Sequence, residues 1–147
     1  MNTHTKFIVV EDNPADLQLT QLAFQNLSLE GELLSFKNGQ DLFDYLAHDG
    51  ASDIAFILLD LNMPQWSGKR ILKNLQNSAI WRSIPVVIFS SSLHEQDIKE
   101  CYALGANAYV TKPFDLQDFE RTIESIANFW GRINMRPSVE VQRSVAA

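Results

Sequence analysis

The chain has 147 residues and a formal charge of −6, from 12 Lys and Arg against 18 Asp and Glu. This length predicts one domain with its own hydrophobic core, and 46% hydrophobic with 20% charged residues argues against a disordered or fibrous chain. The acidic balance, without a basic stripe, argues against charge-driven binding of nucleic acid.

The apolar runs are short, which bears on where the protein is expected to work. Runs such as Ile54–Leu59 fall far short of the about 20 apolar residues that a membrane-spanning helix needs. The N-terminal apolar stretch is also too short for a secretion signal. We therefore expect a cytoplasmic protein with no membrane partner. Cys101 is the single cysteine, so disulfides within the chain and Cys-cluster zinc sites are excluded, and a packed, unreactive thiol is expected.

Short apolar runs alternate with longer helical patterns, which is typical of βαβ units that build a parallel sheet. Strands are expected at Phe7–Val10, Leu33–Phe36, Ile54–Leu59, Val86–Phe89 and Ala108–Val110. Helices are expected at Pro14–Ser28, Asp41–Asp49, Lys69–Gln76, Glu95–Leu104 and Leu116–Trp130. Asn13 before Pro14 indicates the start of the first helix, because Asn is a favoured N-cap and Pro suits the first turn. The predicted fold class is therefore α/β, with a five-stranded parallel sheet and helices on both faces.

The first expected helix carries apolar side chains in two sectors. The larger sector, which should face the sheet, contains Leu17, Ala23, Phe24 and Leu27 together with Thr20. Leu19 and Leu22 point elsewhere, and two interpretations remain open for them. They belong either to one broad buried stripe or to a small apolar patch for a partner helix.

The domain is expected to span residues 1–130, followed by a tail over residues 131–147. The helical pattern fades from Gly131 onward and the tail ends in small residues. Two interpretations remain open here as well: a frayed terminus, or an arm that packs on a partner subunit.

Polar side chains follow four of the expected strands. Glu11 and Asp12 follow the first strand, Asp60 the third, Ser90 the fourth and Lys112 the fifth. Because the carboxyl ends of parallel strands meet at one edge of the sheet, these groups should converge there. The sequence thus predicts a site with three carboxylates, a hydroxyl and an ammonium.

Three crowded carboxylates favour a hard divalent cation, because each raises the pKa of the others unless a positive charge offsets them. Mg²⁺ fits best, since it uses one or two carboxylates together with phosphate oxygens. Ca²⁺ fits less well because the acids come from separate strand ends. Zn²⁺ fits least, because His4, His48 and His94 lie on different segments without ligand spacing.

A metal with carboxylates at this edge indicates phosphoryl transfer. Asp60 can act as an oxygen nucleophile that forms an aspartyl phosphate. Lys112 can neutralise charge on the transferred group, and the Ser90 hydroxyl can hydrogen-bond one of its oxygens.

These residues lie in motifs with a specific order and spacing. Ser90 follows Asp60 by 30 residues, and Lys112 follows Ser90 by 22. From Lys6 to Trp130 the chain resembles the receiver domain of two-component response regulators, which implies a doubly wound, flavodoxin-like (CheY-like) fold with strand order 2-1-3-4-5. The motifs that carry the resemblance are VVEDN through Glu11 and Asp12, LLDLNMP through Asp60, then Gly68, IPVVIFSSS through Ser90, and AYVTKPF through Tyr109, Lys112 and Pro113.

The resemblance implies a role for each matching position. It also implies a cis peptide bond between Lys112 and Pro113. The implied roles are Asp60 as phosphoacceptor, Asp12 as direct Mg²⁺ ligand, Glu11 as the acid that holds the ion less directly, Asn62 as a ligand through its backbone carbonyl, Ser90 as switch hydroxyl, Tyr109 as the aromatic that moves with it, and Lys112 as the lysine that pairs with phosphate.

Less specific sequence features resemble those of the regulators that pair with phytochrome-type histidine kinases. They are the EDNPAD motif, Trp81 before the fourth strand, the ANFW motif near the end of the last helix and the 48-residue interval from Asp12 to Asp60. Glu11 departs from the more usual Asp at its position, which bears on the affinity for Mg²⁺.

The function implied is that of a single-domain response regulator in a phosphorelay. A histidine kinase would donate phosphate to Asp60, and Leu19 and Leu22 are the candidate kinase-docking residues. The output would be protein contact through Glu95–Leu104, Ala108–Val110 and Leu116–Trp130, where a homodimer involving the C-terminal tail is an option. We expect no enzymatic activity other than, at most, hydrolysis of the protein's own aspartyl phosphate.

Two alternatives come from other classes. A haloacid-dehalogenase-like phosphatase also uses a strand-end Asp, Mg²⁺ and a lysine, but it needs a general acid where this chain has Asn62. A phosphate-independent adaptor could keep the fold, although the complete set of site residues argues against it.

Overall fold

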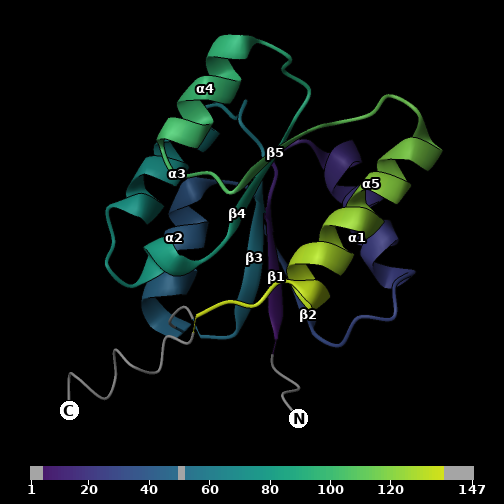
Figure 1. Ribbon diagram of the computed structural model, residues 1–147, viewed down its shortest axis with the longest axis horizontal. Helices are drawn as coiled ribbons and strands as arrows, with labels where there is room; N and C mark the ends of the chain where they lie inside the picture. Colours follow the sequence, from purple (N-terminus) through teal and green to yellow (C-terminus); the bar gives the residue numbers. More distant parts are fainter. Residues whose placement is uncertain (1–4, 50–51, 138–147) are drawn as a thin grey trace.

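A five-stranded parallel sheet forms the centre of the computed structural model, which describes residues 5–49 and 52–137 (Figure 1). The strand order is β2-β1-β3-β4-β5, and every neighbouring pair is parallel. This confirms the predicted α/β class and order 2-1-3-4-5. The strands are β1 (Lys6–Val10), β2 (Glu32–Phe36), β3 (Ile54–Leu59), β4 (Val86–Ser90) and β5 (Ala108–Thr111).

Helices cover both faces of the sheet, as a doubly wound fold requires. Helices α1 and α5 lie on one face and α2, α3 and α4 on the other (Figure 1). Their bounds are α1 (Pro14–Gln25), α2 (Gly39–Asp49), α3 (Gly68–Gln76), α4 (Glu95–Ala103) and α5 (Leu116–Asn128), with a 3-10 turn η1 (Trp81–Ser83) and a π-helical turn η2 (Phe129–Ile133).

The ends of the first helix follow from local capping. At its start, the Asn13 side chain accepts a hydrogen bond from the Asp16 amide at 3.1 Å, as the Asn-Pro signal predicts. Its end was predicted too late, at Ser28. The helix stops at Gln25, where its last turn tightens: the Asn26 amide still bonds the Leu22 carbonyl oxygen, but the Leu27 amide bonds that of Phe24, only three residues back, at 3.1 Å. Apolar periodicity alone does not contain this signal.

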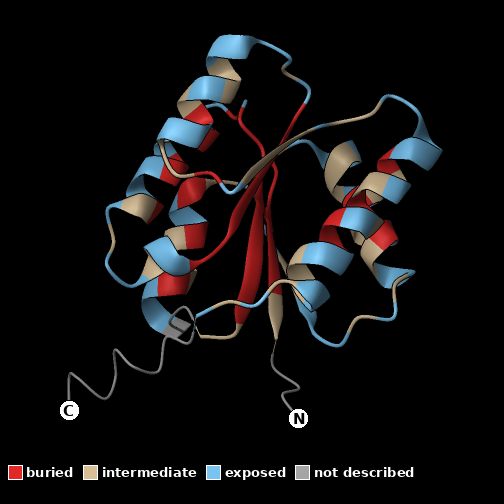
Figure 2. Ribbon diagram, viewed as in Figure 1, coloured by how far each residue is buried: buried red, intermediate tan, exposed pale blue. Residues whose placement is uncertain are grey.

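The core lies in two layers, one on each side of the sheet (Figure 2). All six residues of β3, the central strand, are buried, whereas the edge strands β2 and β5 are exposed or partly buried. Leu19 packs against the layer under α1 and α5, so it belongs to the broad apolar stripe. Leu22 instead leaves 47% of its surface exposed.

Three further expectations concern the rest of the chain. Residues 131–133 complete η2, and residues 138–147 of the predicted tail lie outside the described residues. In the described ranges, no helix has the length and apolar content to cross a bilayer. Cys101 is confirmed as a packed thiol, and burial raises its pKa to about 11, which keeps it protonated at neutral pH.

Candidate functional site

The predicted site residues meet at the carboxyl edge of the sheet, the upper edge in Figure 1. Strand pairing continues one residue beyond the strands and holds their backbone in place, so the sheet itself sets the spacing of the site. The amides of Glu11, Asp60 and Lys112 donate hydrogen bonds to the carbonyl oxygens of Phe36, Val10 and Ser90, at 3.0, 3.1 and 2.9 Å.

Three carboxylates form an acidic cluster. One oxygen from each of Glu11, Asp12 and Asp60 lies within 4.8 Å of the other two. Glu11 and Asp60 are buried and Asp12 is partly buried. Hard oxygen donors at this separation suit a divalent cation of the Mg²⁺ or Mn²⁺ type, which binds carboxylates and keeps some of its water. The donor set of this cluster therefore fits the metal site that the sequence predicts.

Lys112 contacts two acids of this cluster and a third acid outside it, Asp16. Its ammonium donates hydrogen bonds to Glu11 Oε1 at 2.7 Å and Asp16 Oδ2 at 2.9 Å, and it lies 3.2 Å from Asp60 Oδ1. Only 10% of its side chain is exposed. The Lys112 cluster, which we define as Lys112, Glu11, Asp16 and Asp60, is therefore a buried ion network and not a solvated surface pair.

Burial dominates the electrostatics of the acids. It raises the pKa of Glu11 to about 7, although the hydrogen bond from Lys112 works in the opposite direction. Burial also raises the pKa of Asp60, against the charge of Lys112. For Lys112 itself burial lowers the pKa, but the hydrogen bonds to Glu11 and Asp16 outweigh it and the net shift is upward. The lysine thus stays charged.

Asp16 is a site residue that the sequence analysis missed. Its position in the first turn of α1 explains it as a favourable charge for the helix dipole, and no other role was predicted for it. The structure adds a contact to a lysine 96 residues away. One signal was available. Because α1 starts only a few residues after β1 ends, an acid in the first turn of α1 is expected near the carboxyl edge of the sheet.

The hydroxyl residues connect the site to the loop before α4. The Ser90 hydroxyl is buried and accepts a hydrogen bond from the Ser92 amide at 3.1 Å. The Tyr109 hydroxyl donates to the Ser92 carbonyl oxygen at 2.9 Å. Both predicted switch residues thus meet on Ser92, a contact that spacing along the chain could not predict.

One detail implied by the resemblance is wrong. The Lys112–Pro113 bond is trans, as is every peptide bond in the described ranges. Strand pairing bonds the Lys112 amide to the Ser90 carbonyl oxygen. From this position the long side chain reaches Glu11, Asp16 and Asp60. A cis bond is therefore not needed to aim the ammonium.

The loop after Asp60 is held close to the start of α3. The Gly68 amide donates to the Leu61 carbonyl oxygen at 2.8 Å, and a β-carbon at Gly68 would collide with the Asp60 carbonyl oxygen. Glycine is therefore required by this close approach. Asn62, the predicted carbonyl ligand, is exposed on this loop beside the acidic cluster in sequence.

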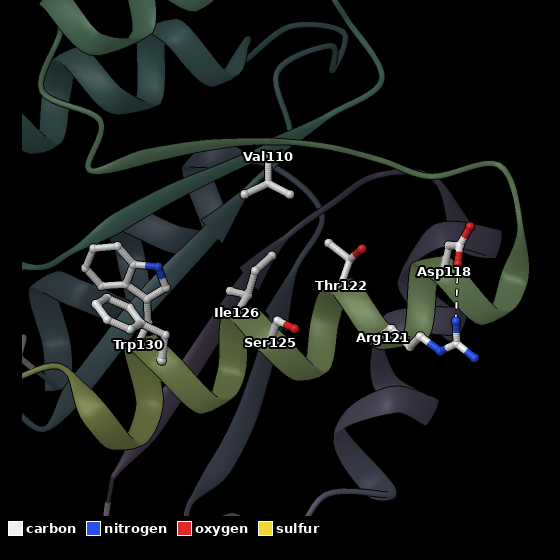
Figure 3. A pocket seen from close by; sticks show the side chains of 8 residues that line it. Val110, Asp118, Arg121, Thr122, Ser125, Ile126 and Trp130 are labelled. Atoms are coloured by element: carbon white, nitrogen blue, oxygen red, sulfur yellow. Dashed lines mark ion pairs between the residues drawn. The ribbon is translucent and has the colours of Figure 1, made fainter.

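An open groove lies away from these acids, between β5 and α5 (Figure 3). It has a volume of about 430 Å³, and Ile126 and Thr122 of α5 point toward Val110 of β5. The exposed Asp118 and Arg121 form an ion pair at one end. This groove belongs to the face that the sequence analysis expected to make protein contacts.

Comparisons with known proteins agree with this geometry. The family profile described as "Response regulator receiver domain" matches residues 7–124. The probable methanogenesis regulatory protein FilR2 of Methanothrix harundinacea is 34% identical over 88% of this chain and 86% of its own length.

Three further matches are response regulators, and the descriptions of two of them refer to a phytochrome or to a bound metal. The crystal structure of the phosphorylated cyanobacterial phytochrome response regulator RcpA superposes with a TM-score of 0.85, at 34% identity, covering 92% of this chain and 99% of that one. Response regulator Rcp1 of Synechocystis is 31% identical over 84% of this chain and 86% of its own. The Mn²⁺-bound form of an Rcp1 has a TM-score of 0.83 at 28% identity, covering 91% of this chain and 99% of that one.

Proposed function

The chain belongs to the response regulator receiver family, and from that premise we propose that it accepts a phosphoryl group on Asp60 from a histidine kinase. The observation that carries this proposal is that Asp60 belongs to the acidic cluster and also lies 3.2 Å from the Lys112 ammonium. A nucleophilic carboxylate needs both partners, because the group it receives is itself anionic. Family membership also sets aside the haloacid-dehalogenase alternative.

The transfer exchanges one bond to phosphorus for another. An Asp60 carboxylate oxygen forms the new P–O bond while the P–N bond to the kinase histidine breaks, and the imidazole nitrogen keeps the electron pair. Lys112 offsets the negative charge that arrives on the phosphoryl oxygens. Any enzymatic activity of the chain would be limited to hydrolysis of its own acyl phosphate.

Mg²⁺ is the metal that we propose for the acidic cluster. Glu11, Asp12 and Asp60 would hold it with the backbone carbonyl of Asn62, and the bound ion would neutralise charge on the transferred group. The donor set of three carboxylates supports a hard cation, and the relative with Mn²⁺ in its printed description is consistent with this class of ion.

A switch through Ser90 and Tyr109 is the proposed consequence of phosphorylation. The Ser90 hydroxyl would leave the Ser92 amide and bond a phosphoryl oxygen. Because Tyr109 bonds the carbonyl of the same Ser92, movement of this residue would release or reposition the aromatic ring. The change would reach the surface of α4, β5 and α5.

The proposed kinase is of the phytochrome type, supported by the light-signalling relatives, and it would dock on α1. Leu22 is exposed there, whereas Leu19 is packed. Leu22→Asp should slow transfer from the kinase and leave labelling by acetyl phosphate intact. Ile80→Asp is the matched control, because Ile80 is 45% exposed in the turn before η1, away from α1 in the chain. Equal effects of both variants would contradict the docking site.

A homodimer through α4, β5 and α5 is proposed as the output contact. The groove beside Val110, with the exposed Phe129 at its border, supports it. Light scattering of the protein with Mg²⁺ and acetyl phosphate should show a mass increase that Phe129→Asp prevents. Removal of residues 138–147 tests the tail arm, and an unchanged mass would remove the tail from the contact.

The decisive experiment is labelling of Asp60. The protein is incubated with acetyl phosphate and Mg²⁺, and an acid-stable, base-labile phosphate is measured on the wild type and on Asp60→Asn. Label on the wild type alone supports the proposal. Failure of the wild type to take label would overturn it in favour of the phosphate-independent adaptor.

A further inference from the structure

Asp16 has no place in the acidic cluster, yet it contacts the lysine of the site. The cluster consists of Glu11, Asp12 and Asp60, whereas Asp16 lies outside it and contacts Lys112 at 2.9 Å. The contact is partly shielded from water, since 10% of the Lys112 side chain and 29% of the Asp16 side chain are exposed. An ion pair at this depth is screened less than a surface pair.

The backbone of α1 fixes Asp16 in this position. Its amide is capped by Asn13 at 3.1 Å, and its carbonyl oxygen accepts a hydrogen bond from the buried Thr20 hydroxyl at 2.9 Å. The residue is therefore anchored on both sides of its Cα. Its carboxylate is presented to Lys112 by a rigid turn and not by a mobile loop.

The contact between Asp16 and Lys112 lies in a site with an excess of negative charge. Glu11, Asp12, Asp16 and Asp60 against one ammonium leave the site at a formal charge of −3, and a divalent cation reduces this to −1. An anionic phosphodonor must approach this excess of negative charge. The ammonium that would attract the donor is at the same time engaged by Asp16 at 2.9 Å.

We propose that Asp16 is a positioning residue that holds the Lys112 ammonium in the site and competes for it with the phosphoryl group on Asp60. This inference rests on the proposed phosphoacceptor role of Asp60. Asp16 thereby limits how fast the site accepts phosphate. Loss of its charge removes one of the three acidic partners of the ammonium, leaving Glu11 and Asp60, and also removes one repulsive charge, so both effects act in the same direction.

The test compares two variants of Asp16 with a matched control. Asp16→Asn removes the charge at nearly constant shape, and Asp16→Glu keeps the charge. Asp41→Asn is the control, because Asp41 occupies the same position in α2: its amide is capped by Asn38 at 2.8 Å, and it is exposed. A simple loss of the helix-dipole effect would affect both Asn variants alike.

Labelling by acetyl phosphate at saturating Mg²⁺ is expected to be about three- to tenfold faster in Asp16→Asn, as a barrier lower by up to about 1.4 kcal/mol would give. Asp16→Glu and Asp41→Asn should stay within about twofold of the wild type. Equal or slower labelling of Asp16→Asn, with the wild type taking label normally, would overturn the inference and leave the proposed function intact.

A second readout is independent of phosphate chemistry. Nitrogen-edited NMR detects a lysine ammonium when hydrogen bonds slow the exchange of its protons with water. The Lys112 signal should be visible in the wild type and in Asp16→Glu, and it should weaken or vanish in Asp16→Asn. A signal unchanged in Asp16→Asn would contradict the positioning role even if the wild type failed to take label.

Discussion

Two lysines in the described part of the chain each contact several carboxylates, three at Lys112 and two at Lys69, and the two sites differ in almost everything else. The Lys112 cluster lies at the carboxyl edge of the sheet with side chains mostly removed from water. The Lys69 cluster, defined as Lys69, Asp97 and Glu100, joins α3 to α4 with N···O distances of 2.6 and 2.5 Å, and 25–43% of its side chains is exposed.

The same pairing chemistry has opposite electrostatic results in the two places. Hydrogen bonds from Lys69 lower the pKa of Asp97 and of Glu100, because these carboxylates remain hydrated and desolvation opposes the hydrogen bonds only weakly. At the Lys112 cluster, burial raises the pKa of Glu11 and Asp60 despite a lysine at similar distance. Desolvation, and not the ion pair, therefore decides the direction of the pKa shift of the acids in the Lys112 cluster.

The largest expected difference is in phosphoryl transfer. Lys112→Met should reduce labelling of Asp60 by acetyl phosphate roughly a hundredfold, because a preorganised cation at the reacting group is lost. Lys69→Met should stay within about twofold of the wild type. A comparable loss in both variants would show that the distinction between the clusters does not hold for function.

Divalent cations should likewise act on one cluster alone. At about 100 times its Kd, Mg²⁺ stabilises the folded protein by about 2.7 kcal/mol and should raise Tm by several degrees. Calorimetry with MgCl₂ or EDTA should show this shift in the wild type and in Lys69→Met. Asp12→Asn should lose most of it. A full shift in Asp12→Asn would exclude Asp12 as a ligand.

The pH dependence of stability should have opposite signs in the two clusters. The pKa of Glu11 is raised from 4.5 to about 7, so its stabilising effect is complete below pH 4.5 and is lost as the pH rises through about 7. Urea unfolding of the protein in EDTA should show this loss, and Glu11→Gln should remove it. If the Glu11→Gln variant still loses stability as the pH rises through about 7, another group causes the loss.

For Asp97 and Glu100 the pKa is lowered from ordinary values of 3.8 and 4.5. Their stabilising effect is therefore present above those values and is lost as the pH falls through the lower folded values. Lys69→Met should flatten the acid side of the same stability curve and leave its neutral side unchanged. An effect on the neutral side would mean that the clusters are coupled.

The smallest expected effect concerns the link between the clusters. The Ser92 hydroxyl donates to Asp97 Oδ2 at 2.5 Å, while the Ser92 backbone contacts Ser90 and Tyr109. Ser92→Ala should lower the free energy of unfolding by about 1 kcal/mol in urea titrations. It should leave labelling of Asp60 within about twofold, because the backbone contacts remain. A tenfold change in labelling would show that the hydroxyl itself belongs to the site.

Local patterns predicted most of the fold and of the site. The apolar runs placed β3 at the observed residues, and the Asn13-Pro14 signal placed the start of α1. Periodicity failed where a helix ends by capping, as at Asn26, and it could not tell the packed Leu19 from the exposed Leu22. Both depend on contacts that a one-dimensional pattern does not contain.

The sequence by itself determined which groups converge, because parallel strands carry their carboxyl ends to one edge and thus bring Glu11, Asp12, Asp60 and Lys112 together. Only the tertiary structure decided how they share charge. The contact of Asp16 with Lys112 and the raised pKa of Glu11 depend on distance and burial. These arise only when segments far apart in the chain exclude water from the same volume.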